Sequence, residues 1–213
     1  MKYQITKKLF YDQYLYRIQL SINKASIWRG GDINFVLNQI FLYNNPEENL
    51  KREFLYVNQC TSRDIEKHTK LYQTLYDLEN YKIRVERNVI SIYSNSVETI
   101  DIIRKSMKNE VISLSEPMSD THKNILSNKN NVIFSRVKFK YKVTVGKLNK
   151  EATNFSLWAK NNQKIQLPRN DEGKLYRGST FLVKDDKTLT MVKMYLGGSI
   201  LRIDEIISPT SVK

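Results

Sequence analysis

Hydrophobic and polar residues alternate most regularly between Ile133 and Val145. Side chains of an extended chain point to opposite sides at successive positions, so this stretch predicts one long β-strand. Its apolar row contains Val137, Phe139, Tyr141, Val143 and Val145. Its cationic row contains Arg136, Lys138, Lys140 and Lys142. Cations on such a row are about 6.6 Å apart, which is close to the phosphate spacing of an extended nucleic-acid strand.

The patterns that precede this stretch indicate a mixture of helices and strands. The expected elements are a strand at 9–22, a helix from 33 to about 44, a short strand at 54–57, a helix at 61–79, a hairpin at 81–93, a helix at 96–107 and a strand at 111–114. This is the βαββαβ order of the ferredoxin-like fold, with a helix and a short strand inserted after the first crossover. RNA-recognition domains share that topology, but topology alone does not determine function.

Two of these strands carry cations or tyrosines that could contact nucleic acid. Tyr14 and Tyr16 alternate on one side of the first strand, and Arg17 lies on the other. In the hairpin, Lys82 and Arg84 share one face. The aromatic residues of the first strand predict either packing within a sheet or a surface on which bases stack.

The pattern changes near Glu116–Asp120, so we expect two lobes, 1–117 and 118–213. The second lobe is expected to be mostly a β meander that includes the basic strand 133–145. One or two helical turns are expected at 154–160, and strands at 164–167, 180–184, 188–196 and 199–207, with turns at Asp185–Lys187 and Gly197–Gly198. The overall fold class is therefore α+β, built on antiparallel sheets.

A weak internal similarity raises the alternative of a structural duplication. An aromatic and basic strand opens each half, at Leu15–Ile22 and Val137–Val145. A basic hairpin follows at Lys82–Tyr93 and at Phe181–Tyr195. The second half shows no clear counterpart of the helix at 96–107.

The charge of the chain favours an anionic partner. The 213 residues include 35 Lys or Arg against 22 Asp or Glu, which gives a net charge of +13. Such an excess is typical of proteins that bind nucleic acid or anionic surfaces. The excess would also follow from a generally basic composition rich in Lys, Asn, Ile and Tyr. The row of lysines would also suit an edge strand that charge protects from aggregation.

The remaining composition limits the cellular setting. The single cysteine, Cys60, permits no intrachain disulfide, which suits a reducing compartment. No apolar run approaches the roughly 20 residues of a membrane span. We therefore expect a cytoplasmic or virion-associated protein without a membrane partner.

Few residues could carry catalysis. One cysteine and two distant histidines exclude Cys/His metal sites and the nicking nucleases that need two histidines one residue apart. Asp185 and Asp186 beside Lys184 have the residue types of a metal-dependent nuclease. A metal-independent RNA-processing nuclease built from paired ferredoxin-like domains would need His68 or His122 as general base, and its glycine-rich loop could only map to Leu196–Gly198, which is far too short.

The sequence thus favours non-catalytic, sequence-tolerant binding of RNA or single-stranded DNA, without a cofactor or metal. The expected contact residues are Arg17, Lys82, Arg84, Arg136, Lys138, Lys140 and Lys142, with stacking on Tyr14 and Tyr16. One alternative is a structural or adaptor component of a nucleoprotein or virion assembly, with protein partners. A second alternative is a nuclease.

Overall fold

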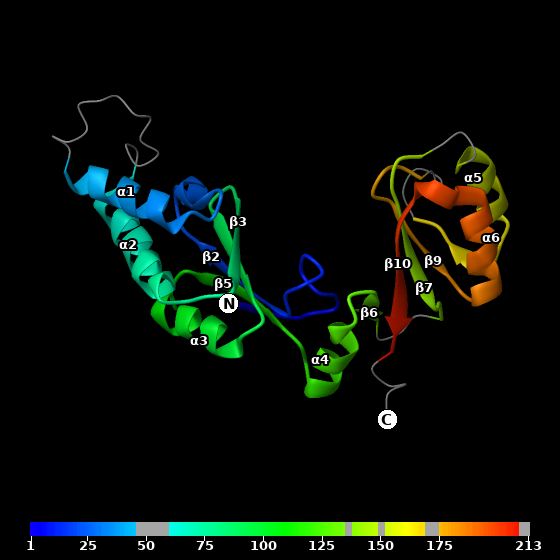
Figure 1. Ribbon diagram of the computed structural model, residues 1–213, viewed down its shortest axis with the longest axis horizontal. Helices are drawn as coiled ribbons and strands as arrows, with labels where there is room; N and C mark the ends of the chain where they lie inside the picture. The colour runs from blue at the N-terminus through cyan, green and yellow to red at the C-terminus, as the bar shows by residue number, and fades with distance from the viewer. Residues whose placement is uncertain (46–59, 135–137, 149–151, 169–174, 209–213) are drawn as a thin grey trace. The chain divides into compact units, whose positions relative to one another are not determined.

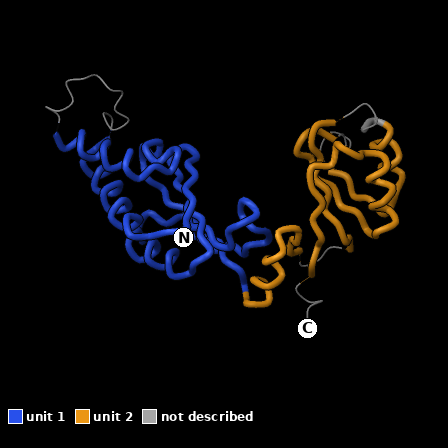
Figure 2. Tube along the Cα trace, viewed as in Figure 1, with its two compact units in different colours: residues 1–118 blue, residues 119–213 orange. Residues whose placement is uncertain are grey.

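The computed structural model describes residues 1–45, 60–134, 138–148, 152–168 and 175–208. The chain divides into two compact units, Met1–Met118 and Ser119–Lys213 (Figure 2). Each unit contains a five-stranded mixed sheet and its own cluster of buried apolar side chains. The expected α+β class is confirmed.

Unit 1 is a sheet whose core side is covered by helices (Figure 1). Its strands are β1 (Lys2–Ile5), β2 (Tyr16–Ser21), β3 (Tyr81–Glu86), β4 (Val89–Ser94) and β5 (Val111–Glu116). Its helices are the 3-10 helix η1 (Ala25–Trp28), α1 (Ile33–Asn44), α2 (Ser62–Tyr76) and α3 (Val97–Ser106). The strand order is β1-β5-β2-β4-β3, with β1 parallel to β5 and the other pairs antiparallel.

Local sequence signals explain where these helices begin. Asp32 accepts hydrogen bonds from two backbone amides of α1, and Ser96 accepts one at the start of α3. Thr61 and Asp64 form a reciprocal capping box at the start of α2. Such caps satisfy amides that have no partner inside the helix, so they fix the first turn.

Four strands of unit 1 have the ferredoxin-like arrangement. Without β1, the order is β5-β2-β4-β3, which places the last and third strands beside the first. This agrees with the expected βαββαβ unit. The edge strand β1 was not expected, and the expected strand at 54–57 lies outside the described residues.

Unit 2 repeats the same topology. Its strands are β6 (Asn131–Ile133), β7 (Tyr141–Val145), β8 (Ile165–Gln166), β9 (Thr180–Val183) and β10 (Ile200–Ile207). Its helices are α4 (Asp120–Ser127), α5 (Ala152–Lys160), α6 (Asp186–Leu196) and the 3-10 helix η4 (Gly197–Ser199). The order β6-β10-β7-β9-β8 matches β1-β5-β2-β4-β3 strand for strand, and β6 is parallel to β10 as β1 is to β5. The chain is therefore a structural duplication.

The prediction of a single basic strand over 133–145 is wrong. β6 ends at Ile133 and β7 begins at Tyr141, and β10 lies between the two strands. β10 is parallel to β6 and antiparallel to β7, so the chain reverses direction between them. The alternation continued across a connection because residue pattern alone does not report which strand occupies the centre of a sheet.

The predicted β meander of the second lobe is also wrong, because residues 186–196 form a helix. Asp185 caps α6 by accepting a hydrogen bond from the amide of Thr188. The buried positions Leu189, Val192 and Leu196 recur at helical spacing. Gly197, expected in a hairpin turn, instead ends this helix with φ of +40°. α6 is the counterpart of α3, which the sequence of the second half did not reveal.

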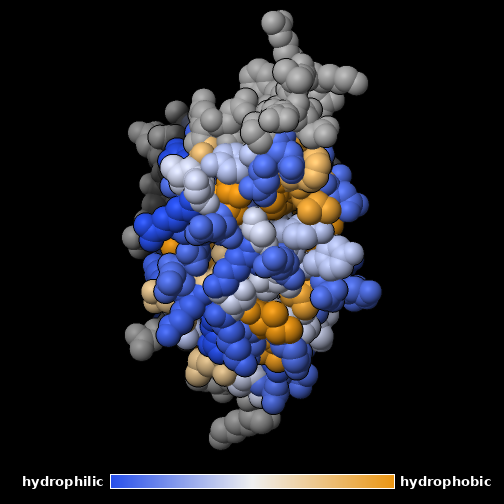
Figure 3. Space-filling model, turned by 90° about the vertical axis from the view of Figure 1, so that its left-hand side faces the viewer, coloured by the Kyte–Doolittle hydropathy of each residue, from blue (hydrophilic) through white to orange (hydrophobic). Residues whose placement is uncertain are grey.

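The side shown in Figure 3 is mostly hydrophilic, and its apolar side chains form small separate groups. None of the helices within the described ranges is long and apolar enough to cross a membrane.

Candidate nucleic-acid interface

The face of the unit 1 sheet that points away from the apolar core carries polar side chains in register across all five strands. Tyr16, Ile18 and Leu20 of β2 are buried in the core, so the alternate positions of β2 belong to the opposite, open face. The first row on that face contains Gln4, Ser115, Arg17, Tyr93 and Lys82. The second row contains Lys2, Ser113, Gln19, Ser91 and Arg84.

The centre of the second row is closed by its own hydrogen bonds. Ser113 Oγ donates to Gln19 Oε1 at 2.6 Å, and Gln19 Nε2 donates to Ser91 Oγ at 3.0 Å. Its two cations, Lys2 and Arg84, lie on the edge strands. The first row differs because it has a cation, Arg17, in the middle of the sheet.

A short hairpin between β1 and β2 folds onto the first row. Phe10 and Tyr14 exchange backbone hydrogen bonds, and the amide of Gln13 donates to the carbonyl of Phe10. Tyr11 and Asp12, at the tip, have φ of +54° and +58°. Two successive left-handed residues are the signature of a type I′ turn, which bulky residues adopt only when their surroundings enforce it.

Aromatic contacts hold this hairpin against Tyr93 of β4. The ring centroids of Phe10 and Tyr11 lie 5.3 and 5.0 Å from that of Tyr93, and the Tyr11 ring meets it edge-on. The ring centroid of Tyr14 lies 6.4 Å from that of Tyr93. Tyr93 is only 5% exposed, so the cluster is packed and its geometry is fixed.

Cations lie over the outer rings of this cluster. Lys82 Nζ is 4.2 Å from the centroid of Tyr11, and the guanidinium of Arg17 is 4.9 Å from that of Phe10. Arg84 donates to the hydroxyl of Tyr11 at 3.3 Å, which raises the pKa of the guanidinium, and it also pairs with Glu86. Alternating rings and cations are the components with which proteins bind single-stranded nucleic acid.

The hairpin and the sheet enclose a pocket of about 540 Å³. Its lining combines four cations, three aromatic rings, three neutral polar residues and two aliphatic residues: Gln4, Ile5, Thr6, Lys7, Lys8, Leu9, Phe10, Tyr11, Arg17, Arg84, Tyr93 and Ser115. No carboxylate is among these described lining residues. A pocket with this chemistry suits an aromatic anion of the size of a nucleotide.

The expected contact residues of unit 1 separate into two groups. Arg17, Lys82 and Arg84 lie together on the open face, and Tyr14 joins them through Tyr93. Tyr16 does not, because it points into the core and is 5% exposed. Its predicted stacking role is therefore wrong.

The expected contact residues of unit 2 do not form one row. Arg136 lies outside the described residues, and Lys138 is exposed just before β7. Lys140 forms an ion pair with Asp186 at 2.8 Å, while Lys142 lies on the open face opposite the core residue Val143. These residues do not share one strand because the chain reverses direction between β6 and β7.

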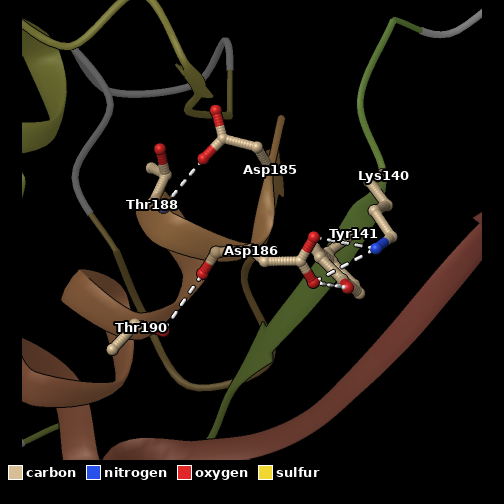
Figure 4. A network of polar contacts seen from close by, with 6 residues as sticks. All are labelled: Lys140, Tyr141, Asp185, Asp186, Thr188 and Thr190. Atoms are coloured by element: carbon tan, nitrogen blue, oxygen red, sulfur yellow. Dashed lines mark hydrogen bonds and ion pairs between the residues drawn. The ribbon is translucent and has the colours of Figure 1, made fainter.

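The carboxylates considered for a nuclease stabilise the start of α6 (Figure 4). Asp186 accepts hydrogen bonds from Lys140 and from the hydroxyl of Tyr141, which lower the pKa of its carboxyl group. Asp185 caps the helix and pairs with Lys164 at 2.9 Å, and these contacts lower its pKa as well. Within the described ranges, no group of three His, Cys, Asp or Glu residues is placed to hold a metal.

Both histidines are buried. Trp28 Nε1 can only donate, so its 3.0 Å hydrogen bond to His68 Nδ1 fixes the tautomer with the proton on Nε2, which faces the carbonyl of Asn23 at 2.9 Å. Burial lowers the pKa of His68 from 6.5 to about 4. His122 is 5% exposed, and its Nδ1 has no hydrogen-bond partner in the part of the chain that the structure describes.

Comparison with known protein families, curated proteins and solved structures finds no match for this chain. Only the geometry described above therefore supports this candidate interface. Sequence reasoning missed Gln4, Tyr93 and Ser115, whose role depends on strand register, and it placed Phe10 and Tyr11 in a continuous strand. The pair of residues with positive φ, Tyr11 and Asp12, lacks the Gly or Asn that usually indicates such a turn.

Proposed function

We propose that the protein binds RNA or single-stranded DNA without cleaving it, through the open face of the unit 1 sheet. The observation that carries this proposal is the pocket between the hairpin and the sheet, which combines four cations with three rings and has no carboxylate among its described lining residues. Cations attract phosphates, and the rings offer surfaces for unstacked bases.

The position of the pocket agrees with single-strand binding. It lies over the central strands β2 and β4 of a ferredoxin-like sheet, where aromatic residues of RNA-recognition domains stack bases. No row of base-reading amides or carboxylates accompanies the rings and cations of the described pocket lining. We therefore expect sequence-tolerant binding that favours single strands over duplexes, because only unpaired bases can stack on the rings.

The test is a fluorescence-anisotropy titration of single-stranded RNA, single-stranded DNA and duplex DNA at about 50 and 200 mM salt. The Lys82→Gln/Arg84→Gln variant should bind single strands more weakly and with a shallower salt dependence, by about 0.7 in the log–log slope for each lost phosphate contact. Both side chains are exposed, so the melting temperature should not fall. The matched control, Lys105→Gln/Lys108→Gln, removes the same charge from α3 and the turn after it and should retain affinity.

The outcomes separate the candidate functions. If no nucleic acid binds even at the lower salt concentration, the binding proposal is wrong and a structural or adaptor role gains support. If both double variants weaken binding equally, the interaction depends on net charge and not on the open face.

A second candidate, RNA cleavage without a metal, is favoured by one observation, the pair of ferredoxin-like units. Its weakness is that His68 is held by Trp28 and Asn23 in the core. Incubating labelled RNA with the protein and EDTA tests it. Products that persist with EDTA and disappear in a His122→Ala variant would support cleavage and contradict non-catalytic binding.

A further inference from the structure

Arg17 is a half-buried cation whose described partners are all neutral. Its Nη2 donates to Gln4 Oε1 at 2.8 Å and to Ser115 Oγ at 3.1 Å, and its guanidinium lies over the ring of Phe10. Its Nε is buried without a hydrogen-bond partner among the described residues. Two directed hydrogen bonds and a ring fix the group in the pocket but leave its charge uncompensated. Partial burial of an unpaired charge is unfavourable, which indicates that the counterion comes from a ligand.

Unit 2 has a buried carboxylate at the position that the hydroxyl of Ser115 occupies in unit 1. Strand order and register place Lys142 of β7 where unit 1 has Arg17, and Asp204 of β10 where unit 1 has Ser115. Asp204 is fully buried and accepts a hydrogen bond from Arg202. Unit 2 therefore supplies a carboxylate from its own chain, whereas unit 1 has a hydroxyl at that position.

The charge of the pocket exceeds that of an internal phosphate of a strand. The lining cations Lys7 and Arg17 alone carry two positive charges, and Arg84, also in the lining, shares its charge with Glu86. An internal phosphodiester carries one negative charge, whereas a phosphomonoester carries about 1.5 to 2 near neutral pH. A monoester also presents three oxygens, which a guanidinium and flexible lysines can contact together.

We propose that the pocket binds the terminal phosphate of a single strand, with that phosphate against Arg17 and the terminal base against the rings of the hairpin. This inference rests on the proposed function, since it names the part of the nucleic acid that the same site recognises. Lys7, exposed on the hairpin side, completes the contact from above the sheet. A strand would then lead away from the pocket across the cations of β3.

The test compares one short single strand with a 5′-hydroxyl, a 5′-phosphate or a 3′-phosphate, and adds a nucleoside monophosphate and inorganic phosphate as competitors. One phosphorylated end should bind about tenfold more tightly than the hydroxyl end, as expected for a hydrogen-bonded charge pair. Arg17→Gln should remove this preference, and Lys7→Gln should reduce it about threefold. Lys2→Gln, which removes a cation of the second row outside the pocket, should leave it unchanged.

The outcomes distinguish this inference from the proposed function. Equal affinity for all three ends in the wild-type protein overturns end recognition and leaves strand binding intact. Competition by inorganic phosphate without binding of any strand supports the phosphate site and overturns strand binding. If Arg17→Gln melts at a lower temperature, Lys7→Gln decides, because its exposed side chain is not needed for folding. An unchanged preference in Lys7→Gln and in a folded Arg17→Gln contradicts the proposal.

Discussion

The two units share one topology but differ in the row of side chains that crosses the open face of each sheet. In unit 1 the row reads Ser115, Arg17, Tyr93 and Lys82, and in unit 2 the equivalent positions are Asp204, Lys142, Leu182 and Gln166. In unit 2 the carboxylate of Asp204 thus takes the place of the Ser115 hydroxyl. Leu182 takes the place of the Tyr93 ring, and the amide of Gln166 takes the place of the Lys82 ammonium. The comparison shows that the fold supplies a surface and the side chains decide what that surface can bind.

The same contrast extends to the cations near each face. Lys140, Lys164 and Arg202 of unit 2 each pair with an aspartate of their own unit. In unit 1, Arg17 and Lys82 instead contact rings and neutral groups. Arg84 of unit 1 pairs with Glu86, so the contrast concerns Arg17 and Lys82, which in our proposal contact a ligand.

The largest expected effect concerns the core of unit 1, where burial lowers the pKa of His68. His68 stays neutral in the folded protein down to about pH 4, whereas in the unfolded chain it titrates near 6.5. The unfolded state therefore binds more protons between these values, and stability falls as the pH falls. The loss should reach about 3 kcal/mol. The negative charge of Asp64 raises the pKa of His68 and so offsets part of the effect of burial, whereas the positive charge of Lys67 lowers this pKa further.

Denaturant titrations at several pH values test this difference, with Trp28 reporting on unit 1 and Trp158 on unit 2. We expect the unit 1 transition to weaken between pH 6.5 and 4 while the unit 2 transition changes little. His68→Gln should be less stable at neutral pH but should lose the dependence over that interval. A parallel decline of both transitions would contradict the assignment to His68.

The second prediction places a carboxylate in unit 1 at the position of Ser115, which is equivalent to Asp204 of unit 2. Ser115→Asp should pair with Arg17, whose Nη2 already donates to Ser115, and it should repel phosphate. We expect affinity for single strands to fall about 100-fold, or about 2.7 kcal/mol. Ser115→Asn has a similar size without the charge and should lose far less, measured by the same anisotropy titration. Equal losses in the two variants would show that steric change and not charge is responsible.

The third prediction places an aliphatic residue in unit 1 at the position of Tyr93, which is equivalent to Leu182 of unit 2. Tyr93→Leu keeps an apolar side chain beneath the hairpin but removes the ring that Phe10, Tyr11 and Tyr14 contact. Single-strand affinity should fall about tenfold, because loss of the buried Tyr93 ring displaces the hairpin and with it the rings of Phe10 and Tyr11, on which bases would stack. Inorganic phosphate should compete as before, since the cations remain. Retained affinity for strands would remove the rings from the interface.

The smallest effect is expected in unit 2. Lys140→Gln removes an exposed ion pair with Asp186, so the melting temperature should fall by no more than a few degrees. Affinity for nucleic acid should stay within about twofold, because one exposed, paired cation contributes little to phosphate binding. A loss as large as that of Lys82→Gln/Arg84→Gln would place unit 2 in the interface.

Local signals in the sequence predict much of unit 1. The caps at Asp32 and Thr61 and the alternation of β3 and β4 act over a few residues, so they are visible without the fold. They also place Lys82 and Arg84 on one face. The candidate site as a whole could not be predicted, because Gln4, Ser115 and Tyr93 meet Arg17 only through the pairing of distant strands.

Unit 2 shows the opposite case. Thr188–Leu196 contains Thr, Val and Tyr, whose β propensity favours a strand, but the cap at Asp185 and burial at helical spacing determine a helix. Likewise, the basic alternation after Ile133 continues through a connection, because β10, which is the last strand in the sequence, lies between β6 and β7 in the sheet. The strand that separates β6 from β7 is distant in sequence, so the local pattern does not reveal it.

The pairing of β2 with β5, and of β7 with β10, has a consequence for how the chain folds. Arg17 and Ser115, on the adjacent strands β2 and β5, are 98 residues apart, so the central pair of unit 1 forms only when nearly the whole unit is present. The equivalent pair of unit 2, β7 and β10, is separated by fewer residues, and long-range pairing slows folding. During synthesis each unit therefore completes itself at its final strand, and unit 1 can close before β10 leaves the ribosome. Unit 1 thus has all of its strands available earlier during synthesis, although its central pair joins residues that are farther apart in sequence.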